Sequence, residues 1–452
     1  MRLRKWQSKC VQAALEHLKL QSKHFFALAT PGSGKSIMAA ELATQLFQQS
    51  KIDLVLCLSP SAEVRDGISR TFKLHRPDIF HDGIGSVFVS MTYQKLLTLD
   101  DEFLKPALNK RLFVILDEVH HCSGGGESIP NAWGNKVLNQ ILAYAKYTLS
   151  LSGTPWRTDK LPIALAKYCV NDSLIVNYQY GLAQAISDGV CRRPIVTLID
   201  NDICNINHKT YASISDALNK TELMYKHIVE DRAALKHILK LSITKLNLIR
   251  SKTPDAAGLV VAYSIEHARK IKQLLEMEFG QTAEIVTYRE KHAQQIIKNF
   301  RHGNAQWIVS VGMIAEGTDI PRLHVCCHIT TVRTELYFRQ ILGRIMRVRS
   351  TDNSKECYLF TFAEPELKRF ADNIQTELPD YKVVYNTAHS AGKTCETHEK
   401  SVRGNCGLIS SNDVLLYEKQ TKTQTDTSNE NTFTWYFHGD FREHIINSFS
   451  QI

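Results

Sequence analysis

The sequence lacks the long apolar stretches and the cysteine pairs that mark membrane-spanning or disulfide-rich chains. No uncharged apolar run approaches the ~18 residues that a membrane-spanning helix needs. The 11 cysteines include no CxxC pair, which argues against both a regular disulfide framework and a zinc ribbon. The basic residues 1–5 run into a polar stretch instead of an apolar one, so we expect no secretory signal. These absences favour a cytoplasmic protein with no membrane partner.

The chain does have enough apolar sequence to build a core. Its 452 residues are 43% hydrophobic and 22% charged, which excludes a chain that is disordered throughout. At about 150 residues per domain, this length suggests roughly three domains. The 55 Lys and Arg against 46 Asp and Glu leave a formal charge of +9, which permits a polyanionic partner without requiring one.

Short apolar runs alternate with amphipathic stretches along most of the chain. Such runs are typical of strands buried on both faces, and the stretches between them of the crossover helices of a parallel sheet. The runs are residues 25–28, 54–58, 87–89, 112–116 and 148–151, and then 258–262, 284–286, 307–309, 324–329 and 357–360. The pattern predicts an α/β fold with two tandem parallel-sheet domains, at 1–190 and 256–385. A helical connecting segment at 191–255 separates them, and a polar C-terminal extension covers 386–452.

The connecting segment has a basic, helical character. Ser213 opens a potential capping box with Asp216, and apolar residues recur at helical spacing over 213–250, which predicts one long helix or two. Residues 219–252 hold eight Lys or Arg against three acidic residues. Two interpretations stay open for this excess: the solvated face of a packing helix, or a face that follows a phosphate backbone through Lys236, Lys240 and Lys245.

The C-terminal extension combines a polar stretch with an aromatic end. Residues 419–432 contain no apolar side chain, which predicts a flexible linker. The aromatic residues that follow are Phe433, Trp435, Tyr436, Phe437 and Phe441. Three interpretations stay open: they fold back onto the chain, they dock onto a protein partner, or they stack on unpaired bases.

The first motif that carries chemistry follows the first predicted strand. Residues 29–36 read Ala-Thr-Pro-Gly-Ser-Gly-Lys-Ser and open a helix, where backbone amides can hold phosphate oxygens. Gly32 and Gly34 allow the close approach, Lys35 can reach the β- and γ-phosphates, and Ser36 can hold Mg²⁺. The predicted nucleotide-binding set is Thr30, Pro31, Gly32, Ser33, Gly34, Lys35 and Ser36.

Two carboxylates follow the strand predicted at 112–116. The carboxyl end of a parallel strand lies at the ligand-binding edge of its sheet, beside the phosphate loop. Asp117 is therefore expected to hold Mg²⁺ together with Ser36, and Glu118 to orient and deprotonate an attacking water.

A third motif lies in the second predicted domain. Residues 340–347 read Gln-Ile-Leu-Gly-Arg-Ile-Met-Arg on a predicted helix, and their spacing puts Gln340, Arg344 and Arg347 on one face. Two arginines aimed across a cleft could neutralise the charge that develops on a transferring γ-phosphoryl group.

With these three motifs in family order, the chain resembles the superfamily 2 helicases, which include the DEAD/DEAH-box proteins. Residues 29–36 resemble motif I, 117–120 motif II as a DEVH box, 152–155 motif III, 309–321 motif V and 340–347 motif VI. The resemblance implies two RecA-like domains, ATP and Mg²⁺ as cofactors, and a nucleic-acid partner. Within the superfamily, the sequence is most similar to bacterial RadD-like repair helicases and the motor subunits of restriction systems.

The same resemblance implies roles for further residues. Gln7, within 3–7, stands where the adenine-reading glutamine does, and Gly317 and Asp319 of motif V join the nucleotide set. His120, Ser152 and Thr154 are implied to couple the ATP site to nucleic acid. The implied contacts to nucleic acid, in loops that touch its backbone, are Pro60, Thr92, Ser264 and Ser310.

We therefore expect an ATP-dependent helicase or translocase that acts on DNA more readily than on RNA, in repair, recombination or restriction. The alternative is an ATP-gated clamp or motor subunit that binds nucleic acid without unwinding it. A catalytically inactive binding module is disfavoured because Lys35, Asp117, Glu118, Arg344 and Arg347 are all intact.

Overall fold

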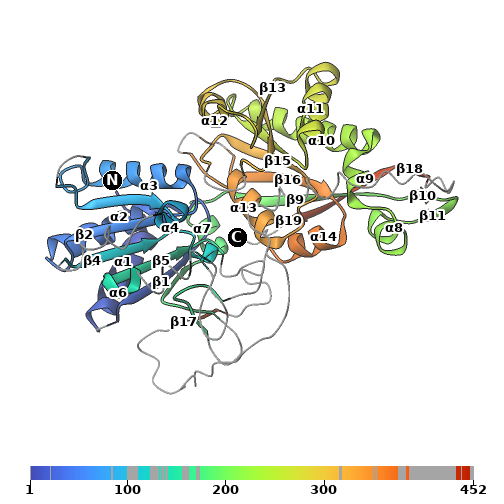
Figure 1. Ribbon diagram of the computed structural model, residues 1–452. Helices are drawn as coiled ribbons and strands as arrows, with labels where there is room; N and C mark the ends of the chain where they lie inside the picture. The colour runs from blue at the N-terminus through green and yellow to red at the C-terminus, as the bar shows by residue number, and fades with distance from the viewer. Residues whose placement is uncertain are drawn as a thin grey trace. The chain divides into compact units, whose positions relative to one another are not determined.

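The computed structural model describes the chain in two compact units. It covers all residues except 1, 21, 83–84, 99–109, 123–131, 133, 135–136, 138–140, 155–161, 169–173, 315–317, 350–351, 353, 375–382, 386–433, 439 and 448–452. The first unit runs from Met1 to Ala185 and also contains the later strand β17 (Val383–Tyr385). The second unit begins at Ile186 and includes the last two strands of the chain (Figure 1). None of the helices among the described residues is both long and apolar enough to cross a membrane.

The first unit is built on a six-stranded parallel sheet with the order β3-β2-β4-β5-β1-β8. The strands are β1 (His24–Ala29), β2 (Leu54–Ser59), β3 (Phe88–Thr92), β4 (Leu112–Leu116), β5 (Ala145–Ser152) and β8 (Tyr178–Tyr180). Every apolar run predicted as a strand in this unit contributes to this sheet. The short edge strand β8 was not predicted.

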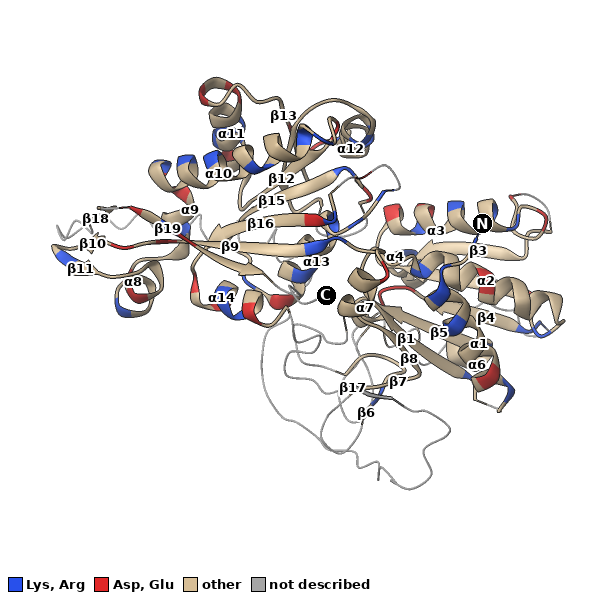
Figure 2. Cartoon of the chain, turned by 180° about the vertical axis from the view of Figure 1, so that it is seen from behind, with Lys and Arg blue, Asp and Glu red and all other residues tan. Residues whose placement is uncertain are grey.

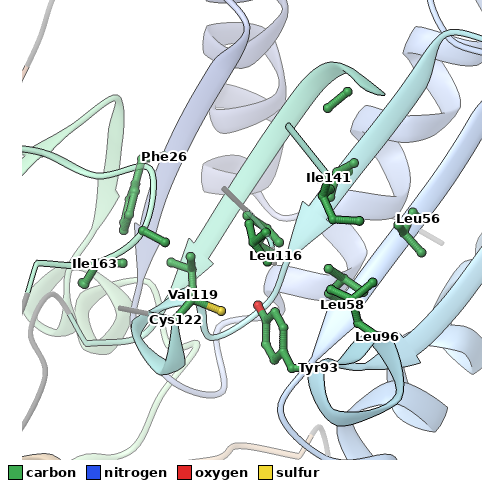
Figure 3. Packing of buried hydrophobic residues seen from close by; sticks show 14 of the residues in the cluster. Phe26, Leu56, Leu58, Tyr93, Leu96, Leu116, Val119, Cys122, Ile141 and Ile163 are labelled. Carbon is green, nitrogen blue, oxygen red and sulfur yellow. The ribbon is translucent and has the colours of Figure 1, made fainter. Parts of the chain in front are cut away.

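Helices and loops cover this sheet on both faces. Helices α1 (Lys5–Lys19), α2 (Lys35–Gln48) and α3 (Ala62–His75) lie side by side. The alternate residues of the strands, such as Leu56, Leu58 and Leu116, enter a buried cluster with Tyr93 and Val119 (Figure 3). Burial on both faces explains why these strands are continuously apolar instead of alternating. The smaller elements of the unit are α4 (Tyr93–Leu97), the 3-10 turn η2 (Val119–His121), α6 (Leu142–Tyr144), β6 (Lys167–Tyr168) and β7 (Leu174–Val176), with α7 (Leu182–Ser187) at the boundary.

The second unit contains a seven-stranded sheet with the order β13-β14-β12-β15-β16-β9-β19. Its strands are β9 (Arg193–Asn201), β12 (Ala257–Ala262), β13 (Ala283–Thr287), β14 (Trp307–Val311), β15 (Leu323–Ile329), β16 (Glu356–Phe362) and β19 (Phe441–Asn447). All neighbours pair in parallel except β19, which runs antiparallel to β9. The helices after β12 are α11 (Ile265–Gln273), the π-helix η4 (Leu274–Glu278), α12 (Ala293–His302), α13 (Glu335–Ile345) and α14 (Pro365–Asp372). Two α/β units with parallel sheets confirm the predicted fold class.

The segment predicted as a helical connection at 191–255 begins with strands. Strand β9 pairs with β16 from Arg193 to Ile199 and belongs to the second sheet, and β10 (Cys204–Ile206) and β11 (Lys209–Tyr211) form a hairpin. The apolar run 195–199 was the signal in the sequence for β9. The second α/β unit therefore starts about 70 residues earlier than 256, since its boundary lies at Ile186.

Helices occupy the rest of this segment, as three elements. These are α8 (Ile214–Lys220), α9 (Tyr225–Glu230) and α10 (Arg232–Arg250). The Ser213 hydroxyl caps α8 by accepting a hydrogen bond from Asp216 N at 2.9 Å, and the Asp231 carboxylate caps α10 through Ala234 N at 2.8 Å. The predicted apolar stripe of α10 is buried, and the helix packs against β15 and β16.

The aromatic end of the chain folds back onto the second unit. Strand β18 (Trp435–Phe437) pairs with β10, and β19 pairs with β9 along its whole length. Phe441 stacks on His237 of α10 with the ring centroids 4.8 Å apart, and Trp435 lies 6.1 Å from His227. Of the three interpretations, the structure shows the fold-back. Tyr436 keeps 57% of its surface exposed in this arrangement, and a protein partner for this segment stays a prediction. Phe433 and the stretch 419–432 lie outside the described residues.

Candidate active site

The loop between β1 and α2 has the geometry of a phosphate cradle. Gly32 and Gly34 adopt left-handed backbone conformations, with φ of 80° and 95°, which other residues adopt only at a cost. A side chain on Gly34 would also meet the Gln7 amide nitrogen at 2.8 Å. Helix α2 begins without a side-chain cap and without an acidic residue in its first turn. Its first amides and its positive dipole end therefore remain suited to an anion.

Lys35 links this loop to the second motif. Its Nζ lies 3.1 Å from Glu118 Oε1 and donates to the Ala29 carbonyl at 3.3 Å. The other carboxylate oxygen of Glu118 accepts a hydrogen bond from Gly153 N at 3.2 Å. A Cβ on Gly153 would come to 3.0 Å from both Lys35 Nζ and Pro31 Cγ, so glycine leaves room for this close approach. Motifs I, II and III thus meet at one carboxylate.

Glu118 is held in an unusual backbone conformation. Its φ of 48° and ψ of 51° lie in the left-handed region, which costs on the order of 1–3 kcal/mol for a residue other than glycine. Burial alone would raise the pKa of Glu118, but the charge of Lys35, His120 and the hydrogen bonds from Lys35 and Gly153 outweigh it and lower the pKa to about 2. The side chain is therefore an ionised carboxylate at neutral pH, as a proton acceptor must be.

The neighbouring Asp117 is in a different environment. It is 6% exposed, and burial, followed by the charge of Glu118, raises its pKa to about 7. The Tyr93 hydroxyl donates to the Asp117 carbonyl at 3.0 Å. A buried carboxylate with an unfavourable charge suits a divalent cation, which would supply the missing positive charge. The donor set of Ser36 and Asp117 therefore fits Mg²⁺, which prefers hard oxygen ligands and several waters.

The three residues implied to couple the ATP site to nucleic acid lie together. His120 Nδ1 is 2.9 Å from Ser152 Oγ, 3.3 Å from Thr154 Oγ1 and 3.5 Å from Glu118 Oε2. Thr154 N donates in turn to Ser152 Oγ at 3.1 Å. All three residues are buried. A shift of the strand end at Ser152 would therefore reach Glu118 through the His120 imidazole and through the Gly153 amide.

Gln7 contacts the phosphate loop from helix α1. Its amide nitrogen donates to the Gly34 carbonyl at 2.9 Å, and its amide oxygen accepts from Arg4 N at 2.7 Å. Arg4 adds a second link, with its guanidinium donating to the Ser33 carbonyl at 2.6 Å. Sequence reasoning missed Arg4, whose position three residues before Gln7 was the available signal. The base contact of Gln7 stays a prediction.

The candidate residues of the second unit form a separate cluster. Arg344 donates to the Thr318 carbonyl at 2.9 Å, and Arg347 forms an ion pair with Asp319. Motifs V and VI therefore lie side by side. Gly317, the remaining motif V residue of the predicted nucleotide set, lies outside the described residues.

The prediction that Arg347 shares a helical face with Gln340 and Arg344 is wrong. Helix α13 ends at Ile345, and Arg347 instead forms an antiparallel bridge with Cys191. The reason is that the amide of Arg192 donates to the Met346 carbonyl at 2.7 Å, which draws the backbone out of the helix.

The four residues predicted to touch nucleic acid lie at the carboxyl edges of the two sheets. Thr92 ends β3 opposite the end of β2, just before Pro60, and Ser264 and Ser310 lie at the corresponding edge of the second sheet. Pro60 and Ser310 are buried, whereas Thr92 and Ser264 are partly exposed. The Thr92 and Ser264 hydroxyls also cap α4 and α11. Of the four positions, these two present side chains at the surface.

Comparisons with known proteins agree with this arrangement. The family described as type III restriction enzyme, res subunit, matches residues 1–157, and the helicase conserved C-terminal domain matches residues 235–349. An uncharacterized protein of Mycobacterium leprae is 27% identical over 83% of this chain and 64% of its own length. The chain thus spans less than two thirds of that relative.

Solved structures share the fold. A fragment of the HsdR subunit of a type I restriction enzyme from Vibrio vulnificus matches with a TM-score of 0.56 and 16% identity, over 84% of this chain and 68% of the fragment. Dbp5 from Saccharomyces cerevisiae, bound to RNA and ADP BeF3, matches with a TM-score of 0.52 and 13% identity, over 84% of this chain and 89% of that one.

Proposed function

We propose that this chain, which belongs to superfamily 2 of the helicases and is related to the motor subunits of restriction enzymes, hydrolyses ATP to move along or unwind nucleic acid. The main observation behind the proposal is that Lys35 and Gly153 both contact the Glu118 carboxylate. Lys35 is the first residue of α2, whose N-terminus has no side-chain cap. A phosphate cradle and a residue that positions the attacking water are parts that nucleotide hydrolysis requires.

In this proposal each residue of the first unit has one task. The amides of residues 32–36 and Lys35 bind the phosphates, and Ser36 and Asp117 hold Mg²⁺, which neutralises phosphate charge when bound. The Glu118 carboxylate, held by the Gly153 amide, accepts the proton of the attacking water. His120, Ser152 and Thr154 transmit the state of this carboxylate to the end of β5.

The second unit supplies the positive charge for the transition state. Arg344 and Arg347 are proposed to neutralise the γ-phosphoryl group as it leaves, the role of arginine fingers. Arg347 would exchange its partner Asp319 for the nucleotide, and Asp319 would then be free for other contacts. Closure of the two units around ATP, and opening after hydrolysis, would drive the loops at Thr92 and Ser264 along the strand.

DNA is the proposed track. The match of residues 1–157 to a restriction-enzyme subunit supports DNA, and the likeness to Dbp5 concerns the fold alone. Repair, recombination or restriction would be the setting. The alternative is an ATP-gated clamp that binds without unwinding.

The experiment that tests the proposal measures ATP turnover with single-stranded DNA, forked DNA, duplex DNA and RNA, followed by strand displacement on the best activator. A motor shows nucleic-acid-stimulated turnover together with displacement or directional movement. A clamp shows ATP-dependent binding with stimulated or basal turnover but no displacement. The Lys35→Ala variant serves as the control for contaminating ATPases, and turnover equal to that control would contradict both functions.

A further inference from the structure

Arg192 is a fully buried arginine that none of the motifs explains. It lies six residues after Ile186, where the second unit begins, and its residue exposure is 0%. Burying a guanidinium is costly unless its donors and its charge are satisfied. The partners of its two terminal nitrogens show what Arg192 holds together.

The Arg192 guanidinium bridges the two motifs of the second unit. Nη1 donates to the Leu323 carbonyl at 2.6 Å and to the Ile345 carbonyl at 2.8 Å, and Nη2 donates to the Pro321 carbonyl at 3.1 Å. Pro321 closes motif V two residues after Asp319, and Ile345 ends helix α13 two residues before Arg347. The contact with Ile345 also places a cation at a helix C-terminus, where the dipole favours it.

A buried ion pair fixes the guanidinium in this position. Arg192 pairs with Asp352, and both side chains are 0% exposed. Asp352 in turn accepts hydrogen bonds from Arg349 N at 2.8 Å and Arg349 Nε at 3.0 Å. The main chain adds two further links, since Arg192 N donates to the Met346 carbonyl and Cys191 forms a β-bridge with Arg347. The backbone on both sides of Arg347 is therefore held from the start of the second unit.

We propose that Arg192, fixed by Asp352, is a positioning residue that sets the direction in which Arg347 and Arg344 present their guanidinium groups. This inference rests on the proposed function, in which those arginines act on the γ-phosphoryl group. Arg192 itself touches neither nucleotide nor Mg²⁺ in this account. It acts by holding motif V and the end of motif VI at a fixed separation, and a displacement of about 1 Å at such a site can cost as much as about 100-fold in rate.

The chain offers a matched control for the loss of a buried arginine. Arg322 is 2% exposed and also donates to three carbonyls, those of Phe300 at 2.9 Å, Asp255 at 2.8 Å and Ala305 at 2.5 Å. Its guanidinium contacts neither motif V nor α13 in these bonds. Arg192→Met and Arg322→Met therefore remove the same kind of group from the same unit, and only the first removes the link between the motifs.

The test compares these variants in the full chain by ATP turnover with saturating single-stranded DNA, together with thermal unfolding. We expect Arg192→Met to lower kcat about 10-fold with the KM for ATP changed less than about 2-fold, because the phosphate cradle lies in the first unit. Arg322→Met should lower the unfolding temperature comparably and leave kcat within about 2-fold. Equal kcat losses in the two variants, or an unchanged kcat for Arg192→Met, would overturn the inference.

A double-mutant cycle separates positioning from a general effect on the fold. If Arg192 acts through Arg344 and Arg347, adding Arg192→Met to the variant Arg344→Ala/Arg347→Ala should slow its turnover no more than about 2-fold further. Multiplication of the two losses would show that Arg192 acts elsewhere. If Arg192→Met does not fold, Arg192→Lys replaces it in the cycle, because a lysine keeps the charge but cannot span three carbonyls. Wild-type turnover of Arg347→Ala would refute the arginine-finger role itself and remove the premise of the inference.

Discussion

The charged residues of the two units are arranged on different principles. In the first unit the groups proposed for the reaction contact one another: Lys35 meets Glu118, and Gly153 and His120 approach the same carboxylate. In the second unit the proposed groups contact neighbours that they would have to leave, since Arg347 pairs with Asp319 and Arg344 donates to the Thr318 carbonyl. The groups of the first unit already contact one another, whereas Arg344 and Arg347 are bonded to other residues of the second unit.

This difference indicates where regulation enters. In the proposed function, the phosphates of ATP are bound by residues 32–36 of the first unit. In the proposed function, Arg347 reaches the γ-phosphoryl group only after it leaves Asp319, which would link the chemical step to a rearrangement of the second unit. The comparison predicts large losses of turnover from the first set, smaller losses from the second, and the smallest effects from basic residues outside both.

The largest effect is expected for Glu118→Gln. The amide keeps the shape of the side chain but cannot accept the proton of water, so hydrolysis should fall by at least ~100-fold while ATP affinity stays nearly intact. Single-turnover hydrolysis and binding of a fluorescent ATP analogue measure the two quantities. Glu16→Gln, on the exposed face of α1, is the matched control, and near-normal turnover of Glu118→Gln would remove that residue from the mechanism.

Arginine loss in the second unit should give the next largest effect. Arg344→Ala and Arg347→Ala are expected to slow turnover at least ~10-fold and to spare most nucleotide affinity, because such arginines act mainly on the transition state. Steady-state kcat and KM separate the two contributions. Arg369→Ala removes an exposed arginine paired with Glu366 and should change neither. Wild-type rates in both variants would contradict the two-unit mechanism.

A smaller effect is expected for Tyr93, which connects a predicted nucleic-acid contact of the first unit to its proposed ATP site. The Tyr93 hydroxyl donates to the Asp117 carbonyl, and Tyr93 directly follows Thr92, a predicted nucleic-acid contact. Tyr93→Phe removes that bond, worth about 1 kcal/mol, together with the hydrogen bond between the hydroxyl and Cys122. It should lower the stimulation of turnover by DNA a few-fold while basal turnover stays unchanged. The ratio of stimulated to basal rate is the measurement. An equal fall in both rates would show a role in the ATP site alone.

The sequence predicted the parts that depend on local pattern. Strands buried on both faces, the glycine-rich loop and the Asp117–Glu118 pair follow from apolar runs and spacing, and the structure places them as expected. It missed what depends on long-range pairing: β9 and β19 join one sheet although about 240 residues separate them. The exit of Arg347 from its helix has the same cause, since the Cys191 bridge comes from 156 residues away. Helical spacing cannot predict such a contact, because the partner residue is far from residue 347 in the sequence.

The basic helix α10 should give the smallest effect. Figure 2 shows its Lys and Arg residues along the helix, yet Lys236 pairs with Glu278 at 2.7 Å and Lys245 lies 4.4 Å from the centre of the Tyr358 ring. These contacts favour the solvated face of a packing helix over a face that follows phosphates.

The test of α10 is the salt dependence of DNA binding. Each phosphate contact that is lost lowers the magnitude of the slope of log K against log salt by about 0.7 to 0.9. We expect the triple variant Lys236→Ala/Lys240→Ala/Lys245→Ala to leave the slope within about one such unit, since Lys240 is the member for which no intrachain ion pair or ring contact competes among the described residues. Titrations between low and high salt, with Lys240→Ala alone as the matched comparison, measure it. A fall of about two units or more would show that Lys236 and Lys245 leave their partners to bind phosphate, and α10 would then belong to the nucleic-acid track.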